Sequence, residues 1–174
     1  MIQTIITYPD KRLKNISKEV TTFDDKLHTL LDDMYDTMMG QNGVGLAAIQ
    51  IAIPLRVLVL NIPDEENEQH KENLIEMINP SIISSEGETS YQEGCLSVPG
   101  FYEDITRAET VSVEYFDRDG NKQQLQADEL LSVAIQHEMD HLEGKLFIEK
   151  LSYAKRKKFE KELKKQLREN KKAS

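Results

Sequence analysis

The sequence predicts an α+β fold of short, mostly antiparallel strands around a central metal-binding helix, with one further helix near each end of the chain. Apolar residues recur at helical spacing between residues 27 and 38 and again between residues 159 and 167. Stretches rich in branched apolar residues, or alternating in polarity, lie between them and are typical of strands. Strands and helices do not alternate regularly, which favours α+β over a doubly wound parallel sheet.

The first helix is expected to begin after a capping side chain, Thr22 or Asp24, and to end at Gly40. His28 lies off its apolar face, so we expect a surface histidine there. The residues of that apolar face are Leu27, Leu30, Leu31, Met34 and Met38.

A loop with two glycines, Gly43 and Gly45, comes next. Residues 43–48 read G-x-G-x-x-A, which is the dinucleotide-binding fingerprint. That fingerprint requires a preceding strand, whereas here a helix precedes the loop and Pro54 follows it. We therefore expect the glycines to allow close approach of a substrate, with the amide of Gln50 as a nearby donor.

The strands are expected in the middle of the chain, separated by a polar loop over residues 64–73 that carries an exposed His70. The turn at residues 117–120 should join the last two strands in a hairpin. The expected strands cover residues 56–62, 75–78, 82–85, 110–116 and 122–127.

The central helix is expected to start after Asp128 and to close at Gly144. It carries His137 and His141 four residues apart, on one helical face, where both imidazoles can bind one metal ion. Glu138 follows the first histidine, as in H-E-x-x-H hydrolases, where this glutamate is the general base.

Two histidines leave such a site short of a third protein ligand. Phe147 stands where metzincins carry a third histidine. Glu160 and Glu162, the downstream acidic candidates, lie in a charged helix expected to face solvent. Cys95, the one cysteine of the chain, is the better candidate, and a Cys/His/His set would suit Zn²⁺ or Fe²⁺.

Three strings stand in order along the chain: GVGLAAIQ at 43–50, EGCLS at 93–97 and QHEMDH at 136–141. Together they resemble the peptide deformylases, which remove the formyl group from the N-terminal formylmethionine of newly made proteins. The resemblance extends from residue 1 to about residue 165. The extended C-terminal helix is similar to the form found in Gram-negative bacteria.

The resemblance implies a role for each matching residue. Cys95, His137 and His141 would be the metal ligands and Glu138 the general acid and base. Gln50 and the backbone N–H of Leu96 would stabilise the oxyanion, and Gly45 would contact substrate backbone. The resemblance also implies Fe²⁺ as the usual metal, with Zn²⁺, Ni²⁺ or Co²⁺ able to replace it.

Selectivity for methionine requires an apolar slot beside the metal. Leu130, Val133 and Ala134 share the helical face of His137, so we expect them to line this slot. Val44 and Tyr91 are expected to close it.

One stretch departs from the family pattern. Many bacterial members carry an arginine shortly after EGCLS, within reach of the substrate chain. Here residues 101–104 read FYED, and the first arginine in this stretch is Arg107. The resemblance therefore does not say which residues contact the substrate beyond its methionine.

Two other classes of protein share parts of the pattern. A hydrolase of a different class would use Cys95 as a nucleophile with a histidine as its base. A metal-stabilised ribosome- or RNA-binding module would need a closed site with four protein ligands, and the sequence offers three.

Composition and charge indicate how many domains the chain forms, where the protein is located and which partners it binds. A chain of 174 residues is expected to form one domain, with residues 152–174 as a basic helix and tail. The absence of a signal sequence, of a membrane-spanning apolar run and of a second cysteine predicts a cytoplasmic protein with no membrane partner. Residues 1–149 hold 11 basic and 28 acidic groups, whereas residues 150–174 hold 11 basic and 3 acidic groups. The acidic body argues against direct DNA binding. The charge pattern alone favours a solvated helix at residues 152–174, whose lysines keep it soluble. The resemblance implies nascent formylmethionyl polypeptides as partners of the protein, and a ribosome contact through this basic helix.

Overall fold

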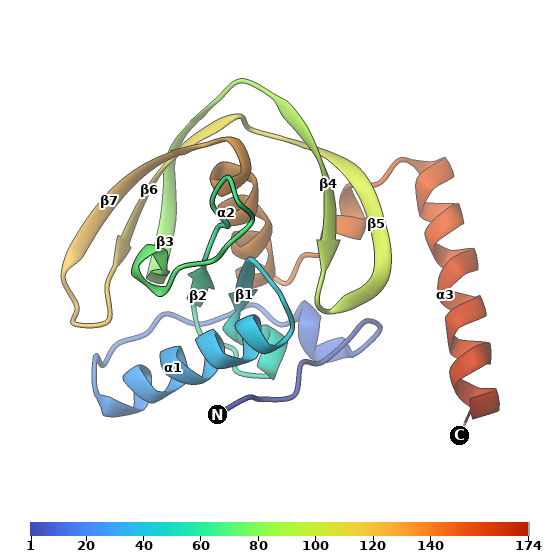
Figure 1. Ribbon diagram of the computed structural model, residues 1–174, viewed down its shortest axis with the longest axis horizontal. Coiled ribbons are helices and arrows are strands. Elements are labelled where there is room, and N and C mark those ends of the chain that lie inside the picture. The colour runs from blue at the N-terminus through green and yellow to red at the C-terminus, as the bar shows by residue number, and fades with distance from the viewer. Residues whose placement is uncertain (174) are drawn as a thin grey trace.

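A computed structural model describes residues 1–173 and has the expected α+β class (Figure 1). Within these residues the helices are α1 (Asp25–Gly40), α2 (Glu129–Leu142) and α3 (Tyr153–Ala173). The strands are β1 (Gly45–Ala47), β2 (Val57–Leu60), β3 (Ile75–Glu86), β4 (Thr89–Cys95), β5 (Val98–Arg107), β6 (Thr110–Phe116) and β7 (Lys122–Asp128). None of these helices combines the length and the apolar character needed to cross a lipid bilayer.

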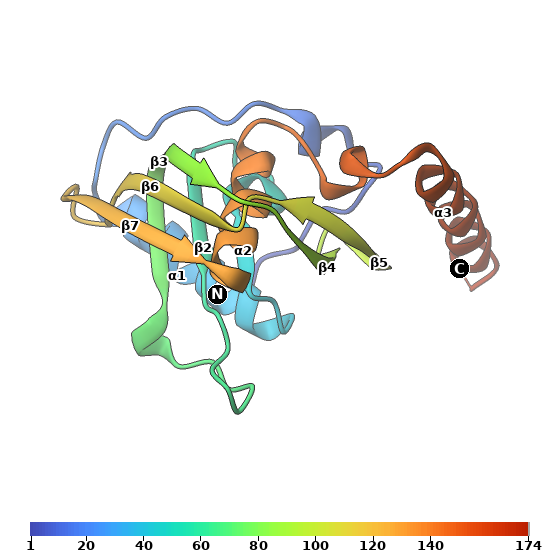
Figure 2. The ribbon, with the colours of Figure 1, turned by 90° about the horizontal axis from the view of Figure 1, so that it is seen from above.

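Five strands form one sheet in the order β1-β2-β3-β6-β7, and each neighbouring pair is antiparallel. Strands β4 and β5 form a separate antiparallel hairpin that arches beside α2 (Figures 1 and 2). The sequence did not indicate this hairpin or β1. Its expectation of two strands at 75–78 and 82–85 was also wrong, because β3 is continuous and absorbs the break as two register shifts against β6.

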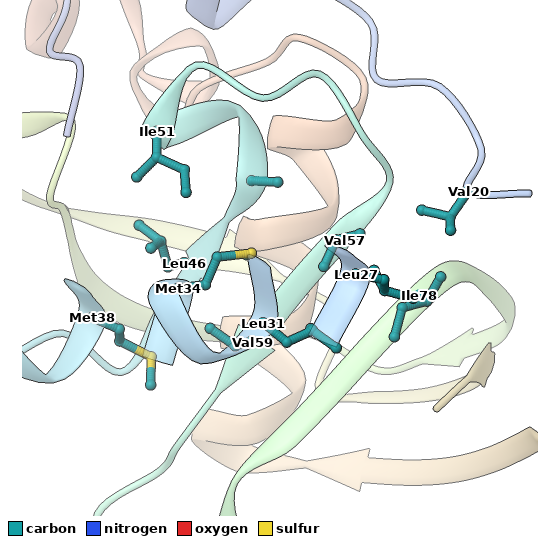
Figure 3. Packing of buried hydrophobic residues seen from close by; sticks show 11 residues of the cluster. Val20, Leu27, Leu31, Met34, Met38, Leu46, Ile51, Val57, Val59 and Ile78 are labelled. Atoms are coloured by element: carbon teal, nitrogen blue, oxygen red, sulfur yellow. The ribbon is translucent and has the colours of Figure 1, made fainter. Parts of the chain in front are cut away.

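Strand β2 is the centre of the core because both of its faces are buried. Val57 and Val59 pack with the apolar face of α1, as Figure 3 shows. Leu58 and Leu60 point the other way and pack with α2. The alternation of side chains along a strand thus explains why this stretch has no polar position. The sheet is consequently held between α1 on one face and α2 on the other.

The ends of the two sheet-packing helices follow the sequence signals with one exception. Asp24 caps α1, since its Oδ1 accepts a hydrogen bond of 3.0 Å from the backbone N–H of Leu27. Asp128 occupies the capping position of α2, but its side chain makes no capping hydrogen bond within the described structure. Gly144 closes α2 with φ +70°, and a Cβ at this position would collide with the carbonyl of Lys14.

A third apolar cluster attaches the C-terminal helix to the rest of the molecule. Phe159 of α3 is 2% exposed and packs edge-on against Phe101 of β5, with ring centroids 4.8 Å apart. The ring of Tyr8 also contacts the ring of Phe159, at a centroid distance of 5.6 Å. Figure 2 shows that α3 otherwise lies away from the sheet, at one end of the molecule.

The α1 core allows a direct stability test. Met34 is fully buried, so Met34→Ala leaves a cavity and should lower the free energy of unfolding by about 2–5 kcal/mol. Urea unfolding monitored by circular dichroism measures this change. Leu167→Ala is the matched control, because Leu167 is 49% exposed and should change stability by less than about 0.5 kcal/mol. Equal stability of the two variants would contradict this packing.

Candidate metal centre and substrate cavity

Three side chains from distant parts of the sequence converge beside α2. Cys95 ends β4, whereas His137 and His141 lie one turn apart on α2. One donor atom from each residue lies within 4.8 Å of the other two, and Cys95 Sγ is 3.4 Å from His141 Nε2. The structure therefore brings together the three residues that the sequence indicated as ligands.

The donor atoms are oriented as a metal ion would require. His137 Nδ1 is bound to the carboxylate of Glu93 at 2.8 Å, which leaves its Nε2 for the space shared with Cys95. A carboxylate on the outer nitrogen is the usual partner of a metal-binding histidine. One sulfur and two imidazole nitrogens suit Zn²⁺ or Fe²⁺ and leave a coordination position for substrate or water. These residues thus fit a catalytic divalent metal.

The other two histidines have partners outside this site. His28 Nε2 donates to the backbone carbonyl of Arg118 at 2.8 Å, and His70 Nε2 lies 2.8 Å from Asp64. Their side chains are 31% and 43% exposed, respectively. Neither lies in the cavity beside α2.

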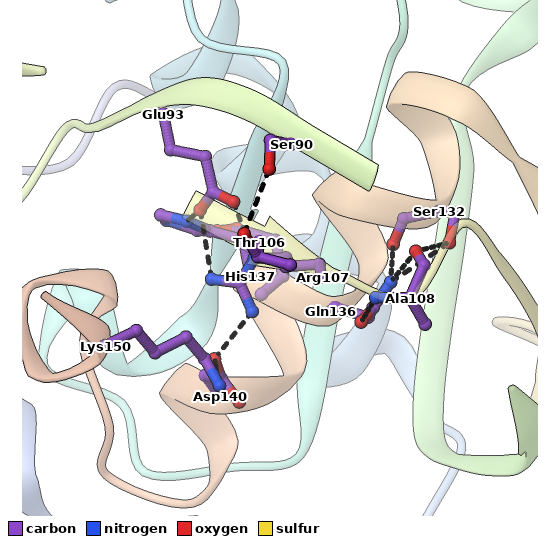
Figure 4. A network of polar contacts seen from close by, with 11 residues as sticks. Ser90, Glu93, Thr106, Arg107, Ala108, Ser132, Gln136, His137, Asp140 and Lys150 are labelled. Atoms are coloured by element: carbon purple, nitrogen blue, oxygen red, sulfur yellow. Dashed lines mark hydrogen bonds and ion pairs between the residues drawn. The ribbon is translucent and has the colours of Figure 1, made fainter. Parts of the chain in front are cut away.

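A buried ion-pair network fixes the position of His137 (Figure 4). Arg107 at the end of β5 binds both carboxylate oxygens of Glu93, at 2.6 and 3.0 Å. Its remaining amino group contacts Asp140 of α2 at 2.9 Å. Glu93 and Arg107 are each 6% exposed. The network therefore joins both strands of the hairpin to α2.

This network also favours positive charge on His137. Burial opposes ionisation of Glu93, but hydrogen bonds from His137 and Arg107 outweigh it and hold the pKa of this carboxyl below its ordinary value. Burial disfavours the imidazolium of His137 as well, yet hydrogen bonds to Cys95 and Glu93 raise its pKa well above the ordinary range. Negative groups thus stabilise positive charge on His137, whereas burial and the nearby His137 and Arg107 hold the pKa of His141 well below its ordinary value.

Glu138 faces the same space and has a different environment. It is 3% exposed, its Oε1 lies 3.9 Å from His137 Nε2, and its Oε2 has no hydrogen-bond partner among the described residues. Burial raises the pKa of Glu138 to about 7. A carboxyl group with this pKa can both accept and release a proton near neutral pH. A Cβ at Gly45 would come within 3.0 Å of Glu138 Cγ, so the glycine allows this close packing.

The ligand set opens into a cavity of about 500 Å³. One wall is the face of α2 with Leu130, Val133 and Ala134, as expected from helical spacing. Val44 and Gly45 of the glycine loop line it too. Tyr91 does not: it pairs with Ile105 inside the hairpin and is not among the lining residues.

The two residues indicated as oxyanion donors lie at the same cavity. Gln50 is 1% exposed, and its Nε2 donates to Ser97 Oγ at 3.1 Å and to Cys95 Sγ at 3.6 Å. Its Oε1 accepts the backbone N–H of Ala47 at 3.0 Å, which fixes the orientation of the amide. Leu96 follows Cys95 and also lines the cavity.

Comparison with known proteins decides the family. The pattern of the family described as polypeptide deformylase matches residues 2–157. The chain belongs to the peptide deformylase family. Its sequence is 59% identical to that of a peptide deformylase of Helicobacter pylori strain P12 over 160 residues, which cover 92% of each chain.

Solved structures agree with this family. A crystal structure of a peptide deformylase from Legionella pneumophila superimposes with a TM-score of 0.89 and 45% identity, over 98% of each chain. A peptide deformylase from Acinetobacter baumannii, described as bound to Met-Ala-Ser, gives a TM-score of 0.81 and 32% identity over 87% of this chain and 99% of that one.

The chain is accordingly a metallohydrolase that removes the N-formyl group from newly synthesised proteins. This activity sets aside the two other classes that the sequence left open, the cysteine-nucleophile hydrolase and the non-enzymatic binding module. In this fold the three donor atoms are divided between two elements: Cys95 lies on the hairpin, and His137 and His141 lie on α2.

Sequence reasoning missed the residues that support the deformylase site. Glu93 was part of a quoted string without a role, and Asp140 lies inside the H-E-x-x-H string. Arg107 was noted only as the first arginine after the FYED stretch, with no role assigned, and the structure buries it behind His137. Tyr102, which lines the cavity, belongs to the FYED stretch that departs from the family pattern, but no role was assigned to it. Contacts between residues so far apart in sequence leave no local pattern.

The Glu93–His137 hydrogen bond predicts a change in metal affinity. Glu93→Gln removes the negative charge behind the histidine and should weaken zinc binding by about 10- to 100-fold. Competition with a chromophoric chelator measures the dissociation constant. Glu86→Gln, an exposed position on β3, is the matched control and should bind zinc as the parent protein does. If all three proteins bind zinc with equal affinity, Glu93 does not contribute to metal binding.

Proposed function

We propose that Cys95, His137 and His141 hold one divalent metal ion and that formyl-group hydrolysis takes place beside it. The main support for this proposal is that the three donor atoms converge next to the buried carboxyl of Glu138. A metal ion held there would act as a Lewis acid, polarising the formyl oxygen and lowering the pKa of water.

Glu138 is the proton carrier in this proposal. It takes a proton from the water molecule that attacks the formyl carbon, and it later protonates the leaving α-amine of methionine. Its pKa of about 7 suits both transfers, because the ionised form that accepts a proton and the protonated form that donates one are then both populated at neutral pH. The products are formate and a free methionyl N-terminus.

Gln50 and the backbone N–H of Leu96 are the proposed donors to the developing oxyanion. Contacts with Ala47 and Ser97 hold the Gln50 amide in place, and its other N–H, which contacts Cys95 Sγ at 3.6 Å, would be the donor that turns to the oxyanion. Preorganised donors of this kind stabilise a transition state more than a flexible side chain would.

We further propose that the methionine side chain lies against Leu130, Val133 and Ala134, with Val44 and Gly45 opposite. This wall is apolar and lies one to two turns from His137 on the same helix. The Acinetobacter baumannii relative is described as bound to Met-Ala-Ser, a product-like peptide, which supports a peptide occupying the cavity beyond its first residue.

Fe²⁺ is the proposed physiological metal, and Zn²⁺, Ni²⁺ or Co²⁺ would be able to replace it. A thiolate with two imidazoles suits these ions better than Mg²⁺ or Ca²⁺, which prefer oxygen ligands. We also propose a cytoplasmic location, where nascent polypeptides are made and a free thiol ligand stays reduced.

Replacing the proposed proton carrier provides the direct test. Glu138→Gln keeps the size of the side chain but cannot accept a proton, so kcat for a formyl-Met-Ala-Ser peptide should fall by about 10²- to 10⁴-fold. Formate release measures turnover, and metal analysis should still find one ion per chain. Glu143→Gln, at the end of the same helix and half exposed, is the control. Near-normal turnover of the Glu138 variant would exclude the proposed role.

We propose that α3 contacts the ribosome. The match to the family pattern ends at residue 157, and beyond Leu163 the described part of α3 is exposed or half-buried. This part carries Lys164, Lys165 and Arg168, whose positive charge suits the phosphate backbone of ribosomal RNA. Its separation from the sheet leaves the helix accessible at one end of the molecule (Figure 2).

Charge reversal tests this contact better than deletion, because deleting residues 152–174 would also remove the buried Phe159. Replacing Lys164, Lys165 and Arg168 by Glu should weaken ribosome binding roughly tenfold or more at low salt, as measured by co-sedimentation. Turnover of a short peptide should not change. Replacing the exposed Lys11, Lys14 and Lys18 by Glu is the matched control. If both triple variants bind ribosomes like the parent, the contact does not exist.

A further inference from the structure

The wall of the cavity opposite α2 is dominated by one exposed aromatic ring. Tyr102 of β5 is 64% exposed and lines the cavity. Its ring lies directly over Gly94, the residue before Cys95, and a Cβ on this glycine would collide with the ring atoms Cε1 and Cδ1. The ring therefore lies against the backbone next to Cys95, and most of the residue remains exposed.

This wall carries no unpaired charge. Among the described residues that line the cavity there is no Lys or Arg. The carboxylate of Glu93 is paired with Arg107 at 2.6 Å, and Glu103, next to Tyr102, is paired with Lys155 at 3.2 Å. Besides the proposed ligand Cys95, the other lining residues on this side are the uncharged Gln92, Gly94, Leu96, Pro99 and Gly100.

The cavity is also larger than a methionine side chain requires. Its volume of about 500 Å³ lies within the range of pockets that enclose a whole small ligand. If the methionine occupies the apolar slot on α2, as proposed above, the β4–β5 wall remains for the residues that follow it. Among the described residues that line the cavity, Tyr102 is the only Phe, Tyr or Trp.

We propose that Tyr102 is a specificity-determining residue, which contacts the substrate side chains after methionine and favours aromatic over acidic ones. A flat ring offers stacking and apolar contact to an aromatic side chain. An acidic side chain finds no cation in this wall and approaches a protein of net charge −9. This inference rests on the proposed placement of the methionine.

The experiment compares three substrates: formyl-Met-Ala-Ala, formyl-Met-Phe-Phe and formyl-Met-Glu-Glu. Each is assayed by formate release with the metal-loaded parent enzyme, Tyr102→Ala, Tyr102→Arg and the control Tyr153→Ala. Tyr153 is 79% exposed on α3, outside the cavity, so its variant should match the parent on all three substrates.

The ratio of KM for the Phe-Phe peptide to KM for the Ala-Ala peptide is the decisive quantity. Tyr102→Ala should raise this ratio by about 3- to 10-fold, because the stacking contact is lost. Tyr102→Arg should lower KM for the Glu-Glu peptide relative to the parent, since it supplies the missing cation. These changes should appear in KM with little change in kcat, which separates substrate contact from general damage to the site.

Unchanged KM ratios in both Tyr102 variants would overturn the inference. The Ala-Ala peptide separates this outcome from failure of the proposed active site. If the parent hydrolyses formyl-Met-Ala-Ala but the ratios do not move, only the role of Tyr102 is wrong. If the metal-loaded parent releases no formate from any of the three peptides, the proposed site itself is wrong, and with it the role of Tyr102.

Discussion

The buried ion pair between Arg107 and Glu93 is the interaction on which the site depends. Arg107 links the carboxylate of Glu93 on β4 to Asp140 on α2, and Glu93 in turn orients His137. Removing one partner of such a pair leaves an uncompensated charge in the interior, which costs several kcal/mol. The network therefore fixes the hairpin against the helix, and that position brings Cys95 within 3.4 Å of His141.

The five-stranded sheet determines where α2 lies. Residues of β2 alternate between the two faces of the sheet, so that Leu58 and Leu60 provide an apolar surface for the helix. The helix packs Ile135 and Leu142 on this surface and turns Glu138 toward the cavity. Because one side of α2 packs on the sheet and the other faces the cavity, the same helix carries both buried apolar side chains and the buried Glu138.

Local signals in the sequence predicted the helices and the histidine pair well, whereas contacts between distant segments were not predictable. Asp24 and the apolar spacing predicted α1, and the i, i+4 spacing predicted that His137 and His141 lie one turn apart on a helix, as they do on α2. The β4–β5 hairpin escaped notice because its burial alternates irregularly and ends in a bulge near Cys95. The pairing of Arg107 with Glu93 joins residues on different strands, so no spacing rule could have indicated it.

The central claim is that one sulfur and two imidazole nitrogens bind a single metal ion. X-ray absorption spectroscopy of the zinc-loaded protein tests it directly. The account predicts one sulfur at about 2.3 Å and two imidazole nitrogens at about 2.0–2.1 Å in the first coordination shell. It also predicts that the sulfur signal disappears in Cys95→Ser. A first shell of nitrogen and oxygen alone in the parent protein would contradict the assignment of Cys95 as a ligand. It would also contradict the claim that the hairpin and α2 bind the same metal ion.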